Sequence, residues 1–246
     1  MSTAGAFPLT VVVPAYNEEA LLAETVRGLR AALTALQLRA EIVIVNDGSG
    51  DRTGAIADEL AAGDPAMVVC HQANQGLGGA LRTGIGVARG DYVLTWPADM
   101  PVAPDDLAPF AASLGRADVL VGVRSRRAGY NPLMRFNSWL YPQIVAALFG
   151  LRLRDVNWIH LYRTALLRQA HLTQRGIPML VEALVRLRDL GATLHEVPSE
   201  MKPRTAGTAS ASRWRVMWRT LRGLLQFWWQ WRRDRNVRPR RNTPRP

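Results

Sequence analysis

The sequence has a single cysteine, Cys70, among its 246 residues, so it forms no internal disulfide and suits a reducing compartment. Cys70 lies in the apolar run AMVVC, where we interpret it as a small core residue rather than a nucleophile. No apolar run reaches the roughly 18–20 residues of a spanning helix. The start MSTAGAFPL lacks the features of a signal peptide. We therefore expect a cytoplasmic protein that does not cross a membrane.

Several nucleotide and metal motifs are also missing. There is no GxxxxGK[ST], which excludes a P-loop NTPase. The stretch GLGGALRTGIG follows the third predicted strand and has Leu81 where a dinucleotide fingerprint needs glycine, which argues against a nicotinamide or flavin cofactor. The histidines show no metal-ligand spacing, and we interpret each as structural or solvated. They are His71, His160, His171 and His195.

Acidic residues are scarce at the C-terminal end. The chain is 48% hydrophobic and 21% charged, as in globular proteins, with a net charge of +11. Residues 202–246 hold 13 Lys or Arg and one acid, Asp234, whereas the first 201 residues hold 18 bases and 19 acids. The basic excess therefore lies in the tail and indicates a local anionic partner.

Apolar, β-branched runs alternate with helical patterns along the chain. Residues 9–13 form a continuous run bounded by Pro14, typical of a buried strand. Asn17 is expected to cap the next helix, with Glu18 and Glu19 in its first turn. Further strands are expected at 42–45, 66–70, 92–96 and 117–124. This alternation predicts an α/β fold with a mostly parallel sheet.

Polar residues follow each predicted strand. In parallel sheets, ligands bind beyond the carboxyl ends of the strands, so these side chains are expected to border one site. They are Pro14, Tyr16, Glu18, Asp47, Asn74, Gly76, Asp99 and Arg124.

The motifs VVVPAYNEE, VNDGSGD and NQGLGGALRTG, followed by the acid after the fourth strand, form a specific set. With GVRSR at 122–126, LRDVNWIHLYR, MLVEAL and the segment 196–210, the chain resembles the family-two glycosyltransferases, which have the GT-A fold. Within them it is most similar to the polyprenyl-phosphate group, of the dolichol-phosphate mannosyltransferase type. The resemblance covers roughly residues 8–210.

The resemblance implies where a nucleotide sugar binds. Pro14, Tyr16 and Glu18 would border the base and ribose, and Asp47 would accept hydrogen bonds from the base. Two alternatives stay open: an Asx turn at Asp47, and a role for Glu18 as a first-turn acid of the helix. The other residues that the resemblance assigns to substrate are Asn74, Gly76, Gly79, Arg82 and Asp155.

The acidic motif DYVLTWPADMPVAPDD departs from the family. Relatives usually have Asp-x-Asp, often followed by Gln, and these coordinate a divalent cation that bridges the diphosphate. Here Pro97 replaces the first Asp, Asp99 is the second, and Pro101 takes the Gln position. Asp99 alone predicts a weak Mg²⁺ or Mn²⁺ site, since Asp105 and Asp106 are expected to cap the next helix. Alternatively, arginines neutralise the leaving diphosphate, from among Arg124, Arg126, Arg127, Arg135 and Arg204.

Acceptor binding is also implied by the resemblance. It assigns the acceptor phosphate to Arg124, Arg135, Ser138 and Arg204. The alternative for each of these arginines is a solvated surface position. The segment WIH at 158–160 stands where relatives usually have a Ser-Gly-Phe-like turn. Specificity for acceptor and sugar is therefore left open.

Two segments point to a membrane surface. Residues 136–151 are apolar and too short to span, which favours a helix that dips into the bilayer edge, with a core helix as the alternative. In the tail, an apolar stripe runs beside a basic one, as in interfacial helices on anionic lipid. The apolar stripe is Trp214, Trp218, Leu221, Leu225 and Trp228; the basic one is Arg215, Arg219, Arg222 and Gln226. Alternatively, the apolar stripe packs on the domain or on a partner, or this helix binds nucleic acid.

We therefore predict a glycosyltransferase domain at 1–210, an amphipathic membrane-interface helix at 211–235 and a disordered basic tail at 236–246. The expected activity is inverting transfer of a sugar from a UDP- or GDP-linked donor to polyprenyl phosphate at the inner face of the membrane, with no nucleic-acid partner. The acceptor phosphate is already an anion, so Asp99, Arg124, Arg135 and Arg204 would suffice for catalysis. The alternatives are transfer to a hydroxyl acceptor, with Glu182 or Asp155 as base, and a catalytically silent nucleotide-binding member.

Overall fold

The computed structural model describes residues 7–100, 103–127, 132–201 and 214–237. Its elements in chain order are β1 (Phe7–Ala15), α1 (Leu22–Ala35), β2 (Ala40–Asp47), α2 (Thr53–Ala61), β3 (Met67–Gln72), α3 (Leu77–Val87), β4 (Gly90–Thr95), α4 (Pro104–Ala112), β5 (Val119–Arg127), α5 (Pro132–Phe149), β6 (His160–Arg163), α6 (Thr164–Gln169), α7 (Pro178–Asp189), β7 (Leu194–Met201) and α8 (Trp214–Val237).

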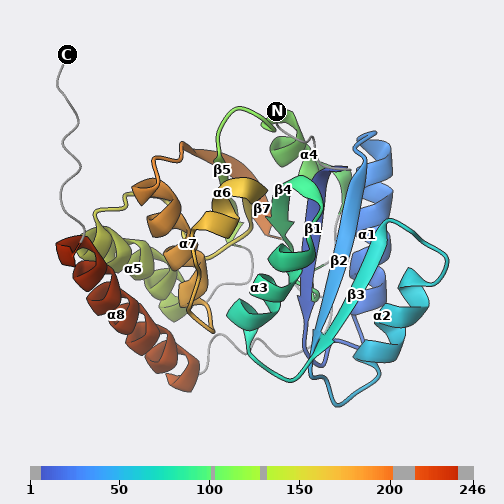
Figure 1. Ribbon diagram of the computed structural model, residues 1–246, viewed down its shortest axis with the longest axis horizontal. Coiled ribbons are helices and arrows are strands. Elements are labelled where there is room, and N and C mark those ends of the chain that lie inside the picture. The colour runs from blue at the N-terminus through green and yellow to red at the C-terminus, as the bar shows by residue number, and fades with distance from the viewer. Residues whose placement is uncertain (1–6, 101–102, 128–131, 202–213, 238–246) are drawn as a thin grey trace.

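The strands form one seven-stranded sheet in the order β3-β2-β1-β4-β6-β5-β7 (Figure 1). All neighbouring pairs are parallel except those of β6, which runs antiparallel to both β4 and β5. The predicted α/β fold with a mostly parallel sheet is therefore confirmed, and its five predicted strands are β1 to β5. The sequence patterns did not reveal β6 and β7.

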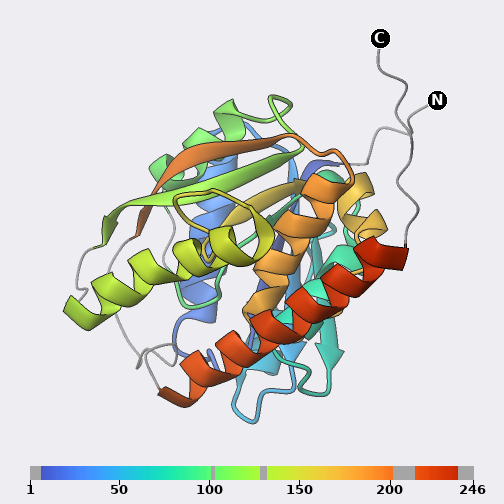
Figure 2. The same cartoon turned by 90° about the vertical axis from the view of Figure 1, so that its left-hand side faces the viewer.

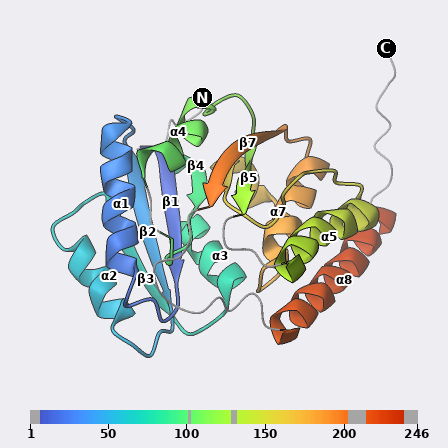
Figure 3. The same ribbon diagram turned by 180° about the vertical axis from the view of Figure 1, so that it is seen from behind.

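Helices cover both faces of the sheet (Figures 1 and 3). On one face α1, α2 and α4 contribute core residues such as Leu22 and Phe110. On the other face lie α3, α5, α6, α7 and α8, with buried residues such as Leu81, Val145 and Leu184. Because successive strand residues point to opposite faces, the continuous apolar run of β1 fills both cores.

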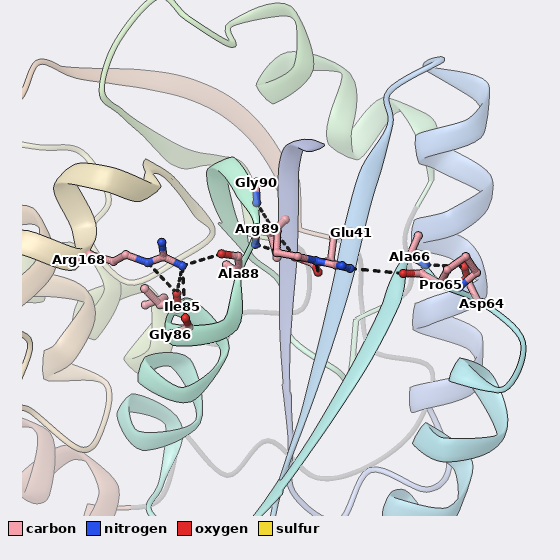
Figure 4. A network of polar contacts seen from close by, with 11 residues as sticks. Glu41, Asp64, Pro65, Ala66, Ile85, Gly86, Ala88, Arg89, Gly90 and Arg168 are labelled. Atoms are coloured by element: carbon pink, nitrogen blue, oxygen red, sulfur yellow. Dashed lines mark hydrogen bonds and ion pairs between the residues drawn. The ribbon is translucent and has the colours of Figure 1, made fainter. Parts of the chain in front are cut away.

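A polar network closes the sheet at the amino ends of β2 and β4 (Figure 4). Glu41 is fully buried and accepts hydrogen bonds from Thr10 Oγ1 at 2.9 Å and from Arg89 Nε at 2.5 Å. Gly90 N donates to Thr10 Oγ1 at 2.9 Å. Nearby, Arg168 donates to carbonyl groups at the end of α3. Glu41 and Arg89 therefore pair with each other, and Arg168 binds the last carbonyl groups of α3. Both interactions lie at the edge of the sheet opposite to the predicted site.

The C-terminal helix α8 packs along α5 and α7 (Figure 2). Leu224 and Phe227 are fully buried, and the Phe227 ring stacks on Phe149 of α5 at 5.1 Å between centroids. Trp228 Nε1 donates to the Leu148 carbonyl at 2.9 Å, and Trp231 Nε1 donates to an Asp189 carboxylate oxygen at 2.6 Å. One face of α8 is thus part of the folded core.

Candidate functional site

The loops after β1 and β2 are bound to each other at the carboxyl edge of the sheet. Asn17 N donates to Ser49 Oγ at 3.0 Å, and Asn17 Oδ1 accepts from Gly50 N at 2.9 Å. Glu18 N donates to Thr53 Oγ1 at 2.8 Å. These reciprocal bonds place the residues after the first strand next to those after the second, as predicted.

Two local expectations in this region are wrong. Asn17 does not cap a helix: α1 begins at Leu22, and Asn17 lies in the left-handed region with φ of 55°. Glu18 precedes the helix, whose first-turn acid is Glu24, so the alternative role of Glu18 as a first-turn acid does not hold. The tertiary bonds to the second loop replace the helix cap that we expected.

The predicted base-binding acid, Asp47, is buried at the end of β2. Its Oδ1 accepts hydrogen bonds from Gln72 Nε2 at 2.6 Å and from Gln75 N at 2.8 Å. The side chain that closes the turn is that of Asn46, whose Oδ1 accepts from Ser49 N at 3.1 Å. Asp47 therefore does not close the turn but links β2 to the loop after β3.

The glycine-rich loop after β3 packs closely against the loop after β2. A Cβ on Gly48 would lie 2.7 Å from Asn74 N, and Gly76 has a positive φ of 74°. A Cβ on Gly79 would lie 2.3 Å from the side chain of Gln75. A larger side chain would be strained or would clash at these positions, and the loop they shape holds Gln75, whose N–H binds Asp47.

Part of this loop already has protein partners. Gly78 N donates to the Arg175 carbonyl at 2.6 Å, and Arg82 Nη1 donates to the Gln174 carbonyl at 2.7 Å. One amide at the start of α3 and the Arg82 guanidinium therefore bind the segment before α7. The assignment of Arg82 to substrate stays a prediction.

Asp99 lies in the turn that follows β4. Trp96, Ala98 and Met100 are buried, and Trp96 Nε1 and Thr25 Oγ1 both donate to the Met100 carbonyl, at 3.2 and 3.3 Å. The anchored turn leaves Asp99 partly exposed at the carboxyl edge. The carboxylate therefore stands where the resemblance places the metal-binding acid.

The described residues offer no cluster of acidic, histidine or cysteine side chains for a metal ion. Among the residues that the structure describes, no group of three or more His, Cys, Asp or Glu side chains comes together. Asp106 is a helix cap, as predicted, because its Oδ2 accepts from Ala103 N at 2.6 Å. A cation at Asp99 would therefore take most of its ligands from substrate phosphates and water.

Arg124, near the carboxyl end of β5, forms a buried ion pair with Asp155. Arg124 Nε and Nη2 donate to the two Asp155 oxygens at 2.6 and 2.8 Å, and the guanidinium lies 4.9 Å from the Trp158 ring. Burial favours a raised pKa for Asp155, but the hydrogen bonds and charge of Arg124 outweigh it and lower the pKa. Both groups predicted to meet substrate are thus locked together in their charged forms.

The other predicted acceptor residues are less defined. Arg135 is exposed on α5, and Ser138 Oγ is buried with no hydrogen-bond partner among the described residues. Pro101, Arg204 and the side chains of Arg126 and Arg127 lie outside what the structure describes. The assignments of Arg135, Ser138 and Arg204 therefore stay predictions.

Neither residue considered as a general base is available for that role. Glu182 is fully buried and accepts from Thr173 N, Thr173 Oγ1, Gln174 N and Arg186 Nε, at 2.8–3.0 Å. Asp155 has both oxygens bound by Arg124 and a lowered pKa. Glu182 therefore holds the loop before α7, and Asp155 holds Arg124.

His160 is fully buried at the start of β6. Among the described residues neither ring nitrogen makes a hydrogen bond of full geometry, and its contact with the Val156 backbone is a looser one. Burial lowers the pKa of His160 to about 4, and the Arg124 charge adds to this, while Asp155 and the Val156 backbone act in the opposite direction. The imidazole is therefore neutral near pH 7.

Because His160 is buried in its neutral form, we predict that the fold is sensitive to acid. Its pKa is about 4 when folded and near 6.5 when unfolded, so protonation favours the unfolded chain. Its contribution to the free energy of unfolding is full above pH 6.5 and falls by about 3 kcal/mol as the pH drops to 4. In urea titrations across this range, His160→Phe should remove most of that loss. His195→Gln, at an exposed position, should retain it; parallel profiles for wild type and His160→Phe would contradict the prediction.

Cys70 is half-buried, and burial together with the nearby Glu41 charge raises the pKa of its thiol. A raised pKa disfavours the thiolate, the nucleophilic form. This agrees with the interpretation of Cys70 as a packing residue.

The fold and these residues define an α/β domain whose carboxyl edge carries two acids and a buried arginine–acid pair. Residues 10–176 match the family model described as glycosyl transferase family 2. The chain therefore belongs to glycosyl transferase family 2, as the sequence motifs indicated.

Two curated proteins are similar to this chain over most of its length. The chain is 31% identical over 216 residues to the undecaprenyl-phosphate mannosyltransferase of Micrococcus luteus, covering 82% of this chain and 86% of the relative. It is 30% identical over 198 residues to the dodecaprenyl-phosphate galacturonate synthase of Rhizobium johnstonii, covering 76% of this chain but 59% of the relative. The chain thus spans less than two thirds of the second relative.

Among solved structures, the fold is similar to glucosyl-3-phosphoglycerate synthase from Mycobacterium tuberculosis in complex with Mn²⁺, UDP and phosphoglyceric acid. The TM-score is 0.69 at 18% identity, over 91% of this chain and 79% of that one. At this identity the likeness establishes the fold alone.

Proposed function

We propose that the protein transfers a sugar from a nucleoside diphosphate to polyprenyl phosphate, with inversion at the sugar carbon. The observation that carries the proposal is the position of Asp47, Asp99 and Arg124. Asp47 is the last residue of β2, Asp99 follows β4 and Arg124 lies near the carboxyl end of β5, so all three lie at one edge of the sheet, in a chain similar along most of its length to an undecaprenyl-phosphate mannosyltransferase. That edge is where ligands bind in such sheets.

The donor would lie across the ends of β1, β2 and β4. Asp47 would accept a ring N–H of the base, which uracil and guanine both offer, beside Tyr16 and Glu18. A divalent cation that arrives with the diphosphate would take Asp99 as its protein ligand and would neutralise the leaving group. Arg135 and Arg204 are the candidates to supplement that charge.

The acceptor needs no general base. A phosphate monoester is an anion near pH 7, so its oxygen can attack the sugar carbon directly. One oxygen–carbon bond forms as the bond to the diphosphate breaks, and the nucleoside diphosphate leaves with the electron pair. The fixed bonds of Glu182 and Asp155 support this acceptor class over a hydroxyl acceptor, which would need a base.

We further propose that the outer faces of α5 and α8 lie on an anionic membrane surface. Phe136 and Trp139 on α5 are 54% and 58% exposed, and Trp218 and Trp229 on α8 are 52% and 63% exposed. Leu224, Phe227 and Trp231 pack on the domain instead. The alternative that the apolar stripe packs on the domain therefore holds for Trp228, which packs against the core and binds the Leu148 carbonyl, whereas Trp218 and Leu225 are exposed. The side chain of Trp214 lies outside the described residues.

Several observations support a lipid surface as the occupant. The exposed arginines Arg219 and Arg222 lie beside the aromatic face, which suits anionic headgroups. Asn137 Nδ2 donates to Met217 Sδ at 3.6 Å, so the aromatic ends of α5 and α8 lie together. Within the described part of the chain, no helix is both long and apolar enough to cross a membrane.

Removing two tryptophans should weaken this attachment. We expect the double variant Trp218→Ala/Trp229→Ala to bind vesicles containing phosphatidylglycerol at least tenfold more weakly, because two exposed indole rings leave the interface. Co-sedimentation measures the effect. The matched control, Val87→Ala/Leu190→Ala, removes exposed apolar side chains elsewhere and should bind normally. Equal binding by all three proteins would argue against the membrane surface.

Thermal unfolding with nucleotides tests the donor site. We expect UDP or GDP to raise the midpoint by mass action, in the presence of Mn²⁺. A shift that needs Mn²⁺ supports a cation on Asp99, whereas a shift that survives EDTA supports arginines in its place. If neither nucleotide shifts the midpoint, the result favours the alternative of a catalytically silent member, which Pro97 and Pro101 motivate.

A further inference from the structure

A chain of hydrogen-bonded side chains joins α2, β3 and β2 at the carboxyl edge of the sheet. His71 of β3 lies opposite Asn46 of β2 in the strand register. Asn46 Nδ2 and His71 Nδ1 are 3.1 Å apart, and His71 Nε2 lies 3.0 Å from a carboxylate oxygen of Asp58 on α2. A Cβ on Gly54 of α2 would lie 2.8 Å from Asn46 Nδ2, so the glycine gives the amide its room. These side chains have no part in the mechanism proposed above.

The orientation of Asn46 determines which nitrogen of His71 carries the proton. Asn46 Oδ1 accepts a hydrogen bond from Ser49 N at 3.1 Å, and a backbone N–H can only donate. The other end of the Asn46 amide is therefore its NH₂ group, which donates to His71 Nδ1. Because Nδ1 accepts, the ring proton lies on Nε2 and is donated to Asp58. The two contacts together thus require the Nε2–H tautomer.

Asn46 connects this chain of hydrogen bonds to the loops of the donor site. Ser49, whose N–H it binds, accepts through Oγ from Asn17 N at 3.0 Å. Asn17 stands between Tyr16 and Glu18, the two residues assigned above to the base and ribose. Each step from the imidazole to the loop after β1 is therefore a direct hydrogen bond.

We propose that His71 is a positioning residue for the donor site, because it holds Asn46 in the orientation that closes the turn after β2. The inference rests on the proposed function, since the donor is assigned there to these loops. It does not involve the side chain of Asp47, which points to the opposite face of β2 from Asn46. The bound ring keeps the turn, and with it the loop after β1, in one arrangement.

A second proton on the ring would break this arrangement. Nδ1 would become a donor that faces the NH₂ group of Asn46, and two donors do not bind each other. If Asn46 turned its oxygen to the ring instead, Ser49 N would lose its acceptor. Among the described residues, the charged group that faces His71 is Asp58 on α2, and it binds the other nitrogen. Acid should therefore loosen the loops of the donor site.

The first test reads the tautomer by long-range ¹⁵N–¹H correlation spectra of the full chain. The His71 signals, which are those missing from His71→Asn, should show the proton on Nε2. In Asn46→Asp the carboxylate can only accept, so Nδ1 should then carry a proton. A wild-type ring with its proton on Nδ1 would overturn the proposal, whether or not a nucleotide binds.

The second test measures the affinity for UDP and GDP by calorimetry in the presence of Mn²⁺. His71→Phe cannot accept from Asn46 and should bind the nucleotide about fivefold more weakly, as expected for the loss of one hydrogen bond. His71→Asn, whose amide oxygen can take the place of Nδ1, should retain most of the affinity. His195→Asn, at an exposed position on β7, is the matched control and should bind normally.

The pH profile separates positioning from packing. Between about pH 8 and about pH 5.5, the affinity of the wild type should fall more steeply than that of His71→Asn, because an amide takes no second proton. The phosphates of the nucleotide titrate equally in both measurements. His71 is half exposed on the edge strand β3, so these variants should fold, and His71→Val provides the same test if His71→Phe does not.

The outcomes distinguish this inference from the proposed function. Equal nucleotide affinity in the wild type and His71→Phe, or parallel pH profiles for the wild type and His71→Asn, would overturn the positioning role. Absence of nucleotide binding by the wild type would instead reject the proposed donor site, and the positioning role with it. The tautomer measurement would still decide how His71 and Asn46 bind each other.

Discussion

Replacing Asp99 by Asn should lower kcat for sugar transfer by at least a hundredfold without unfolding the protein. Asp99 is the carboxylate at the end of β4, and the described residues around it form no larger metal-ligating group. We expect a cation brought by the diphosphate to take this side chain as its carboxylate ligand. Loss of a group that stabilises developing charge costs about 10²–10³ in rate.

The matched control is Asp105→Asn, which removes an exposed carboxylate from the first turn of α4. It should leave kcat nearly unchanged. Both variants should melt close to the wild type, since neither residue is buried. If Asp99→Asn retains full turnover, Asp99 has no role in the reaction and the arginines must neutralise the leaving group.

Replacing Asp155 by Asn should destabilise the protein by about 3–5 kcal/mol, because it leaves the buried Arg124 charge without its partner. Transfer should also weaken, through a higher KM for polyprenyl phosphate. The effect is pH-dependent: the folded pKa of Asp155 is lowered, so its stabilisation is present above the unfolded pKa and is lost as the pH falls through the folded one. Urea unfolding at pH 7 measures the stability change.

Two further variants separate folding from function at this pair. The double variant Arg124→Met/Asp155→Leu removes both charges and should regain much of the stability but not the activity. The exposed pair Arg154–Glu196 provides the matched control, and Glu196→Gln should cost less than about 1 kcal/mol. If Asp155→Asn unfolds no more easily than Glu196→Gln, the buried Arg124–Asp155 pair does not stabilise the fold as we describe.

The sequence predicted the parallel half of the sheet well because β1, β2 and β4 are continuous apolar runs buried on both faces. It missed β6, whose four residues His160–Arg163 include a histidine and an arginine. Their burial comes from pairing with β4 and β5 on either side, which local composition does not reveal. Tertiary contacts here outweigh strand propensity.

The site was predicted in part. Motifs indicated Asp47 and Asp99, but Gln72 and Gln75, which bind Asp47, were not recognised because they become its neighbours only when β3 pairs with β2. The proposed base Glu182 binds a loop instead. The one signal for His160 was its place in WIH, where relatives usually have a different turn.

The tail helix shows why periodicity alone is insufficient. Two apolar faces run along α8: Leu224 and Phe227 are buried, whereas Trp218 and Trp229 are exposed. The tryptophan pattern predicted an amphipathic helix. When apolar residues lie on both sides of a helix, however, the pattern alone does not show which side packs on the domain. The aromatic rings of α5 decide it, since Phe149 stacks on Phe227.

The most direct measurement is mass spectrometry of the lipid after incubation of the purified protein with Mn²⁺ and vesicles that contain undecaprenyl phosphate, using UDP- and GDP-linked sugars in turn. We predict that one donor yields a lipid heavier by one sugar, with its single phosphate retained and the free nucleoside diphosphate released. An unmodified lipid with every donor, together with transfer to a free glycan hydroxyl, would contradict the proposed acceptor.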